Sequence, residues 1–309
     1  MLASALRALF LWLSNRRWLG RLAMATPLVR RMPFRFVAGT TLDQAVEAVR
    51  ALNATGASAT LDVLGEAVTD RAAADRAAAA YVATIERIAA EGLDANVSIK
   101  LTQMGLDLGD EECMAVMAPV VAAGARHGVF IRIDMESSAY TGRTLDIVHR
   151  LRAEGHDIGP VIQSYLHRSP ADVERLAADR VRTRICKGAY AEPPEVALQE
   201  RKAIGDAFVA MCQRLLEADA YPGVASHDEE MLSRVAAFAQ ERGIGTDRYE
   251  FQLLYGIRRD LQRRLQADGH RLRVYVPYGT EWYPYFMRRL AERPANVLFV
   301  LRSIIGDRG

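Results

Sequence analysis

The sequence predicts an α/β fold, a (β/α)8 barrel of the TIM type with an N-terminal helical arm. Three observations predict it. Short apolar runs alternate with long helical patterns from residue 56 onward, there are eight such runs, and no stretch rich in Pro, Gly or Ser divides them. Eight strands separated by helices favour a parallel sheet, and eight is the number that closes this barrel. We therefore expect the arm at residues 1–40 and the barrel at residues 41–309.

Each expected strand is a short apolar run bounded by turn residues or charges. The runs are residues 59–65, 96–101, 129–135, 160–166, 181–190, 223–227, 249–254 and 272–277. Helical periodicity is expected at residues 72–91, 111–126, 144–154, 170–179, 194–218, 229–242 and 257–268. A doubly wound open sheet is the structural alternative, but no Gly-x-Gly-x-x-Gly follows the first strand.

Composition argues against nucleic acid as a partner, a disulfide framework and a metal site. The formal net charge of +2 gives no basis for nucleic acid as a partner. The three cysteines (Cys113, Cys186, Cys212) are too few and too scattered for a disulfide framework or a zinc site, which suits a reducing, cytoplasmic location. We interpret Cys186, which falls within the fifth strand, as a packed small residue rather than a nucleophile. The six histidines lie on different elements without metal-ligand spacing, so no metal is expected.

The N-terminal segment leaves two roles open. Residues 1–13 are apolar but too short to span a bilayer, and their first positive charge, Arg7, falls inside the run rather than before it. Leu6, Leu9, Phe10 and Leu13 recur at helical spacing, which predicts an amphipathic helix. This helix could cover part of the barrel or lie peripherally on the inner face of a membrane.

Polar side chains follow nearly every expected strand. In a barrel, chemistry occurs where strands end and the following loops begin, so these residues predict a site at one rim. They are Asp62, Lys100, Asp134 with Glu136, Gln163 with Tyr165, Arg184 with Lys187 and Tyr190, Ser226-His227-Asp228, Gln252 with Tyr255, and Tyr275. Asp62 and Asp228 could instead cap helices, and Gln252 could lie outside the lumen. The cations indicate an anionic ligand, and the interleaved tyrosines suit a planar or apolar ring beside the charge.

Residues 275–296 carry a second cationic pattern. Pro277 and Gly279 stop the eighth strand, and a helix can run from Thr280 or Glu281 until Pro294 blocks it. Tyr285, Arg288 and Glu292 would share one face of this helix, with Arg289 at its shoulder. Two adjacent guanidinium groups suit a clamp for a carboxylate or phosphate. An ordinary solvated helix face with an Arg–Glu pair is the alternative.

Five motifs resemble those of proline dehydrogenase in its short, monofunctional bacterial form. They are Ser98-Ile-Lys-Leu-Thr, Ile133-Asp-Met-Glu136, Arg184-Ile-Cys-Lys-Gly-Ala-Tyr190, Ser226-His227 and residues 275–296. The resemblance runs from about Arg35 to the C-terminus in the family's order and spacing. It implies a distorted (β/α)8 barrel with non-covalent FAD that oxidises L-proline to Δ1-pyrroline-5-carboxylate and passes the electrons to a quinone.

The resemblance also implies roles for individual residues. Arg288 and Arg289 would grip the proline carboxylate, with Lys100 as a third cation and Glu292 in the same ion-pair system. Tyr275 and Tyr285 would wall the proline ring. Asp134 would orient the basic residues. The flavin would contact Arg184 near its N5, together with Met135, Gln163, Lys187, Gly188, Ala189, Ser226 and His227.

Other readings of the sequence remain open. Hydroxyproline oxidation is the alternative within the enzyme class, although Tyr275 would crowd a ring substituent and favours proline. The alternatives from other classes are a non-flavin barrel that binds phosphate or carboxylate, and a peripheral membrane protein that acts through its N-terminal helix. No histidine is clearly placed as a general base, so we expect solvent to take the amine proton. A separate pyrroline-5-carboxylate dehydrogenase would take the product.

Overall fold

The chain folds into a closed barrel of eight parallel strands. The structure is a computed structural model that describes residues 33–65 and 67–292, except for the side chains of residues 288–292. The strands pair in chain order, and β8 closes on β1. Their bounds are β1 Ser58–Val63, β2 Ala95–Ile99, β3 Ile131–Ile133, β4 Ile158–Gln163, β5 Arg184–Cys186, β6 Gly223–Ala225, β7 Glu250–Leu254 and β8 Leu272–Tyr278. The predicted (β/α)8 barrel is confirmed.

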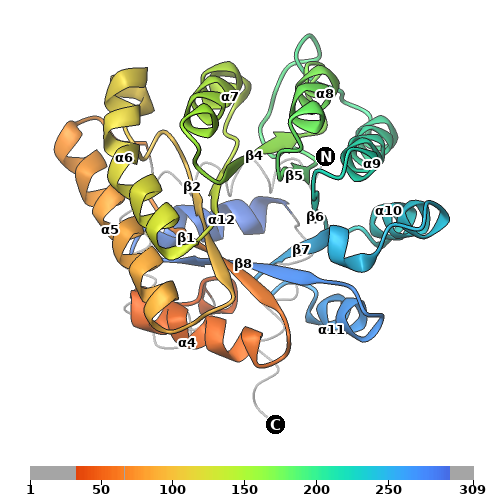
Figure 1. Cartoon of the computed structure of the whole chain (residues 1–309), viewed down its shortest axis with the longest axis horizontal. Helices are drawn as coiled ribbons and strands as arrows, with labels where there is room; N and C mark the ends of the chain where they lie inside the picture. The colour runs from red at the N-terminus through yellow and green to blue at the C-terminus, as the bar shows by residue number, and fades with distance from the viewer. Residues whose placement is uncertain (1–32, 66, 293–309) are drawn as a thin grey trace.

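Helices surround the strands on the outside (Figure 1). They are α4 Leu42–Asn53, α5 Arg71–Ala90, α6 Asp110–His127, α7 Ser138–Ala153, α8 Ser169–Ala178, α9 Arg201–Glu217, α10 Glu229–Glu241, α11 Arg259–Ala267 and α12 Trp282–Glu292, with short 3-10 turns η1 Pro33–Arg35, η2 Leu106–Leu108 and η3 Thr246–Arg248. Most of these helices bury an apolar face against the sheet, which leaves the carboxyl ends of the strands to the loops.

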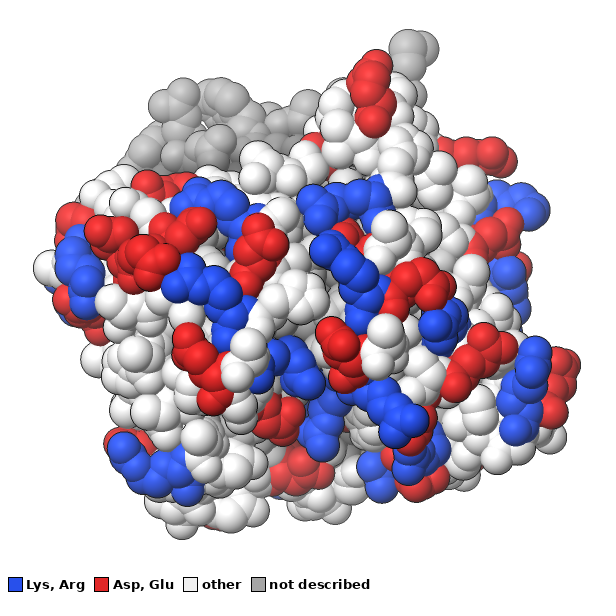
Figure 2. Space-filling view, turned by 45° about the horizontal axis from the view of Figure 1, so that its top comes forward, with Lys and Arg blue, Asp and Glu red and all other residues white. Residues whose placement is uncertain are grey.

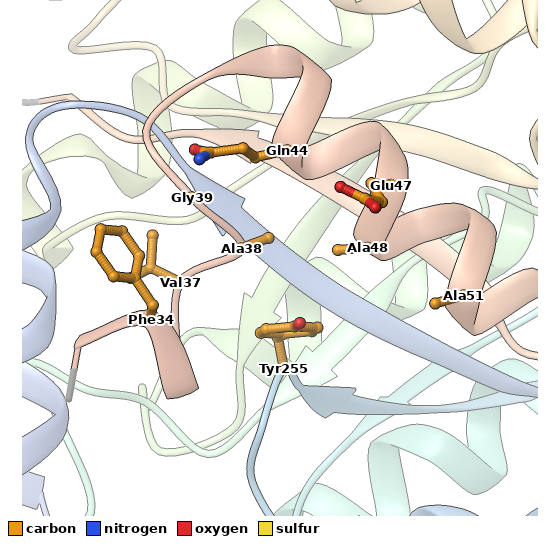
Figure 3. A pocket seen from close by; sticks show the side chains of 9 residues that line it. All are labelled: Phe34, Val37, Ala38, Gly39, Gln44, Glu47, Ala48, Ala51 and Tyr255. Carbon is orange, nitrogen blue, oxygen red and sulfur yellow. The ribbon is translucent and has the colours of Figure 1, made fainter. Parts of the chain in front are cut away.

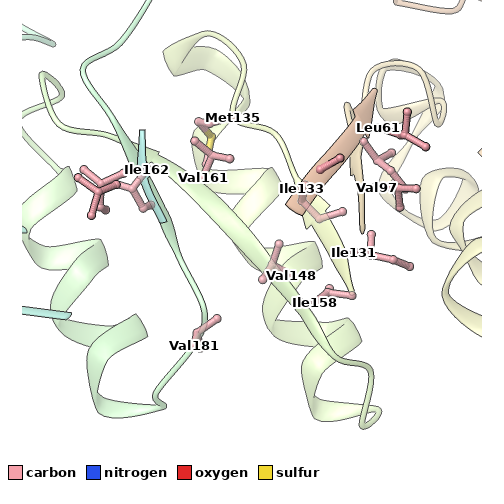
Figure 4. Packing of buried hydrophobic residues seen from close by; sticks show 14 of the residues in the cluster. Leu61, Val97, Ile131, Ile133, Met135, Val148, Ile158, Val161, Ile162 and Val181 are labelled. Atoms are coloured by element: carbon pink, nitrogen blue, oxygen red, sulfur yellow. The ribbon is translucent and has the colours of Figure 1, made fainter. Parts of the chain in front are cut away.

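Alternation along each strand separates an apolar outer face from a polar lumen. In β3, Ile131 and Ile133 belong to the core between strands and helices, and Arg132 points the opposite way. Figure 4 shows part of this core, with Val148 of α7 beside side chains from β3 and β4. Since successive residues change face, a charged residue inside a strand is directed into the lumen, where it needs a partner from another strand.

Several predicted boundaries were wrong. The strand expected at residues 181–190 ends at Cys186, because the chain turns away at Gly188, whose φ is +121°. The helix expected from residue 194 begins at Arg201, after the two prolines at 193 and 194. Helix α4 was not expected, although its N-terminus has a capping box in which Thr41 and Gln44 bond each other's backbone.

The segment before α4 lies against the barrel. Ala38 N donates to Pro277 O at 2.9 Å, and Gly279 N donates to Gly39 O at 3.0 Å, which ties this segment to the end of β8. The amphipathic helix predicted at residues 1–13 lies outside the described residues, as do residues 293–309. The domain limits at residues 40 and 41 therefore stay a prediction.

Charges of both signs are interspersed on the face shown in Figure 2. Many form exposed pairs, such as Arg150 with Glu111 at 2.8 Å and Lys202 with Asp206 at 2.7 Å. In the part of the chain that the structure describes, no helix is long and apolar enough to cross a membrane.

Candidate active site

The Asp134 carboxylate is the centre of a cluster at the carboxyl ends of the strands. It lies directly after β3 and accepts from four side chains of other strands: Ser98 Oγ at 2.5 Å, Tyr275 OH at 2.8 Å, Arg184 Nη1 at 2.9 Å and Lys100 Nζ at 3.4 Å. Burial alone would raise the pKa of Asp134, but Lys100 and Arg184 outweigh it, so the pKa lies below its ordinary value. Asp134 is therefore an anion that holds two cations and a phenol in place.

Lys100 is held by a second carboxylate. Its Nζ lies 2.9 Å from Asp62 Oδ1, and the Asp62 side chain is only 1% exposed. Burial lowers the pKa of Lys100, but Asp62 and Asp134 more than offset it and the net direction is upward, so the ammonium stays charged. The alternative that Asp62 caps a helix was wrong, because Asp62 lies within β1 and faces the lumen.

Arg184 is anchored at two of its three guanidinium nitrogens. Nε donates to Gln252 Oε1 at 2.5 Å, and Nη1 donates to Asp134. The Arg184 guanidinium carbon also lies 5.2 Å from the Tyr275 ring centroid. The third nitrogen, Nη2, is buried and has no hydrogen-bond partner among the residues that the structure describes. The alternative that Gln252 lies outside the lumen was wrong, since it contacts Arg184 there.

The predicted flavin residues after β5 and β6 lie along one side of the rim. Lys187 Nζ pairs with Asp228 Oδ2 at 2.9 Å, and this contact lowers the pKa of Asp228. At Gly188 a Cβ would overlap the Tyr165 ring, so close packing and a positive φ both require glycine. Ser226 Oγ accepts from the backbone N of Asp228 at 3.1 Å. In the same region, His227 Nε2 accepts from the backbone N of Leu254 at 3.1 Å.

The Gln163 side chain joins the loops that follow β3 and β5. As the last residue of β4, it donates from Nε2 to Glu136 O at 2.8 Å, and its Oε1 accepts from Ala189 N at 3.3 Å. Met135, beside Glu136, is buried. Burial raises the pKa of Glu136, which accepts from the Thr102 hydroxyl at 2.6 Å.

Helix α12 packs near the end of β1. Its Tyr285 is buried in an apolar cluster that contains Phe36, Leu64, Trp282 and Phe286. Because Leu64 follows β1, this contact places α12 on the carboxyl side of the strands, and Figure 1 shows it near the middle of the barrel. Arg288, Arg289 and Glu292 belong to α12, but their side chains lie outside the described residues, so the predicted clamp is not tested.

One cavity of the described part of the chain lies away from this cluster. It measures about 380 Å³ and lies between α4 and the segment after η1, with Phe34, Gln44, Glu47 and Tyr255 among its lining residues (Figure 3). Of the rim residues, it includes only Tyr255. No group of three or more metal-ligating side chains occurs among residues 33–65 and 67–287.

Three lumen residues were missed by the sequence reasoning. Arg132, Glu250 and Arg273 lie two positions before Asp134, Gln252 and Tyr275 on the same strands and therefore on the same face. That period-two spacing was the available signal. It becomes informative only when the lumen face of each strand is known.

The fold and this cluster define a (β/α)8-barrel enzyme whose site at the carboxyl ends of the strands presents cations oriented by buried carboxylates. Comparison with known proteins identifies the family. The sequence model of the proline dehydrogenase family matches residues 45–302. The chain belongs to the proline dehydrogenase family.

Individual relatives span nearly the whole chain. Proline dehydrogenase 1 of Bacillus subtilis is 38% identical over 302 residues, which is 97% of this chain and 99% of that protein. The proline dehydrogenase of Deinococcus radiodurans is 39% identical over 276 residues, which cover 88% and 89% of the two chains.

Among solved structures, proline utilization A of Bdellovibrio bacteriovorus superposes with a TM-score of 0.82 at 24% identity. The match covers 91% of this chain and 34% of that one. At this level of sequence identity, the comparison supports the fold alone.

Proposed function

We propose that this chain oxidises L-proline to Δ1-pyrroline-5-carboxylate, with non-covalently bound FAD as the immediate acceptor of the hydride. Membership of the proline dehydrogenase family gives the reaction. The observation that carries the proposal is the Asp134 cluster, in which cations from β5 and the end of β2 converge on one carboxylate at the active end of the barrel.

The residues present fit a flavin. Arg184 Nη2 is a buried donor with no partner in the described part of the chain, which suits an acceptor atom of a bound group. Lys187 supplies a further cation beside the small residues Gly188 and Ala189. FAD would supply the hydride chemistry, and the protein would supply orientation and charge. The residues that would hold it are Met135, Gln163, Arg184, Lys187, Gly188, Ala189, Ser226 and His227.

For the substrate, we propose a carboxylate clamp of Arg288 and Arg289 on α12, supplemented by Lys100 and by Glu292 in the same ion-pair system. Tyr275 and Tyr285 would border the ring. The hydrogen bond from Tyr275 OH to Asp134 supports this role, because it fixes the phenol beside Lys100. A ring held in this way presents one carbon–hydrogen bond in a constant direction. The reacting groups are then already oriented for the reaction and need not find this orientation by chance.

The amine proton would leave to solvent. Among the described histidines, His227 accepts a backbone hydrogen bond from Leu254, and the His167 ring contacts Pro194 O at 2.8 Å. Neither ring is among the hydrogen-bond partners of Asp134. The carboxylates nearest the cluster, Asp62 and Asp134, are occupied by cations, so none is proposed as a general base.

The electrons would pass to a quinone, and a separate pyrroline-5-carboxylate dehydrogenase would consume the product. A contact between the N-terminal segment and a membrane surface would suit a quinone acceptor. Liposome flotation of the full chain against a version lacking residues 1–32 tests that contact.

The first experiment is a visible absorption spectrum of the purified protein before and after anaerobic addition of L-proline. We expect flavin bands that bleach with L-proline. Bleaching by hydroxyproline alone would keep the fold and the flavin but change the substrate. A protein that stays colourless after addition of FAD would contradict the proposal.

A further inference from the structure

We infer that Gln252 is a positioning residue for Arg184 and that a chain of contacts through Glu250 to Arg273 holds Gln252 in place. This inference rests on the proposed function, since it concerns how Arg184 is presented to the flavin. It assigns a role to β7 and β8 residues that lie deeper in the barrel than the cluster around Asp134.

The chain of contacts is continuous. Gln252 Oε1 accepts from Arg184 Nε at 2.5 Å, and Gln252 Nε2 donates to Glu250 Oε1 at 2.6 Å. Arg273 Nε donates to both oxygens of Glu250, at 2.8 and 3.0 Å, and Arg273 Nη1 donates to Ala59 O on β1 at 2.8 Å. The path therefore runs from the backbone of β1 to the guanidinium of β5.

Burial makes these contacts rigid. Glu250 and Gln252 are 4% and 5% exposed, so water does not compete effectively for their polar atoms. Burial raises the pKa of Glu250, but Arg273 more than offsets it, and the net pKa is lowered. Glu250 is thus an anion whose position is fixed by a cation on one side and an amide on the other.

Two anchors determine the orientation of Arg184. A guanidinium is planar, so fixing Nε through Gln252 and Nη1 through Asp134 and Ser98 Oγ, the latter at 3.2 Å, fixes the plane and the direction of Nη2. Nη2 is the nitrogen left without a partner. If Gln252 were removed, Arg184 could rotate about the remaining anchor and Nη2 would lose its direction.

An amide at position 252 also leaves the positive charge of Arg184 unneutralised. Its oxygen accepts from Arg184 without neutralising it, and its NH2 group can face Glu250, which a carboxylate could not do without repulsion. The Glu250 contact therefore decides which way the Gln252 amide points. A positive charge kept near a flavin favours its anionic reduced form.

The test compares three variants with the wild type as holoenzymes. Gln252→Leu removes the anchor, and Gln252→Glu keeps an acceptor of the same size but adds a negative charge. The matched control is Gln262→Leu on α11, because Gln262 is a buried glutamine that bonds Leu254 O and Ile257 O and does not contact Arg184. The measurements are the reduction potential of the bound flavin, kcat and KM for L-proline, and the FAD dissociation constant.

We expect both Gln252 variants to lower the flavin potential and to reduce kcat by roughly tenfold to a hundredfold, the range expected for one hydrogen bond to a charged group. KM should change little, because the carboxylate clamp is separate. The Gln262→Leu control should keep the wild-type potential and kcat. A wild-type potential and kcat in Gln252→Leu, which lacks the acceptor for Arg184 Nε, would overturn this inference and leave the proposed function intact. A wild-type protein that neither binds FAD nor is reduced by L-proline would instead overturn the proposed function.

Discussion

At the scale of single residues, one carboxylate accepts hydrogen bonds from several side chains of the site. Asp134 alone accepts from Ser98, Tyr275, Arg184 and Lys100. A buried carboxylate shared in this way is stable only while its partners stay in place, and each partner is oriented by it in return.

Asp134→Asn should therefore destabilise the fold and impair the reaction. Removing one partner from a buried ion-pair cluster typically costs about 3–5 kcal/mol. We expect a loss of that size in the free energy of unfolding by urea, with a kcat at least about tenfold lower. Asp75→Asn is the control, because Asp75 forms an exposed pair with Arg71 and its loss should cost less than about 0.5 kcal/mol. Equal stability losses in the two variants would contradict the role of Asp134.

The predicted clamp is tested by Arg288→Lys and Arg289→Lys, made separately. Each replaces a planar, bidentate donor by a point charge of the same sign, so the net charge is constant while the geometry is lost. We expect KM for L-proline to rise by roughly tenfold or more, with a smaller change in kcat. Steady-state kinetics with a fixed acceptor measures both constants. Wild-type kinetics in both variants would refute the clamp.

At the scale of elements, two contacts place the residues of the site. Strand β4 approaches β5 closely at Gly159, and α12 rests on the segment that follows η1. Neither Gly159 nor Phe36 is a residue of the proposed chemistry, yet each helps to position an element that carries such residues.

Gly159→Ala should push β4 away from β5. A Cβ at this position would overlap Arg182 O and would lie 3.0 Å from Arg132 Nη1, both of them in the packed interior. We expect a loss of about 1–3 kcal/mol in unfolding free energy, as for other overpacked sites. Gly205→Ala in α9 is the matched control, since its Cβ would make only an ordinary contact with Met231 Sδ at 3.9 Å. That variant should gain about 0.5–1 kcal/mol from helix propensity, so losses of similar size in both would contradict the steric argument.

Phe36→Leu should weaken the support of α12. Phe36 packs 6.1 Å from the Phe286 ring centroid, in the cluster that includes Tyr285. Because the proposed clamp is on the next turn of α12, we expect KM for L-proline to rise by about threefold to tenfold while kcat changes less. Phe208→Leu in the core serves as the control, because it loses similar packing away from α12. An unchanged KM in Phe36→Leu, or an equal rise in both variants, would count against this account.

At the scale of the whole molecule, the lumen holds more charge than a barrel core usually does. Lys100, Arg132, Arg184 and Arg273 lie there with Asp62, Asp134 and Glu250, which leaves one positive charge in excess among these residues. Arg132 donates to the backbone carbonyls of Pro160 at 3.0 Å and of Arg182 at 2.5 Å, and its guanidinium carbon lies 4.7 Å from the Phe130 ring centroid. Burial, followed by Arg184, lowers the pKa of Arg132 to about 9, so it remains a cation at neutral pH.

Stability should accordingly fall in acid. The folded-state pKa values of Asp134 and Glu250 lie below their ordinary values of about 3.9 and 4.3. A lowered carboxyl pKa gives stability that is present above the unfolded pKa and is lost as the pH falls through the folded pKa. We expect the urea unfolding free energy to be steady from pH 7 to 5 and to decline below about pH 4. The decline should be shallower in Asp134→Asn, and parallel curves for the two proteins would argue against a depressed Asp134 pKa.

The sequence was sufficient for the architecture and for part of the site. Eight apolar runs separated by helices predicted the closed barrel, and the strand-end rule correctly brought Lys100, Asp134, Arg184 and Tyr275 together. The chain from Gln252 to Arg273 was not predicted, because Arg184 and Gln252 are 68 positions apart and spacing along one strand does not reveal partners on another. Strand ends were misjudged where apolar residues continue into loops, as after Cys186.

The polar lumen also bears on how the chain finds its strand alignment. An apolar lumen would tolerate a slipped strand, because one buried methyl group resembles another. Here a shift of β7 by one residue would turn Glu250 and Gln252 toward the helices. Arg273 would lose its carboxylate, and Arg184 Nε would lose its acceptor. An unmatched buried charge is costly, so the misaligned barrel would be penalised on several strands at once. The contacts that orient the Arg184 guanidinium thus also favour the correct strand alignment when the barrel closes.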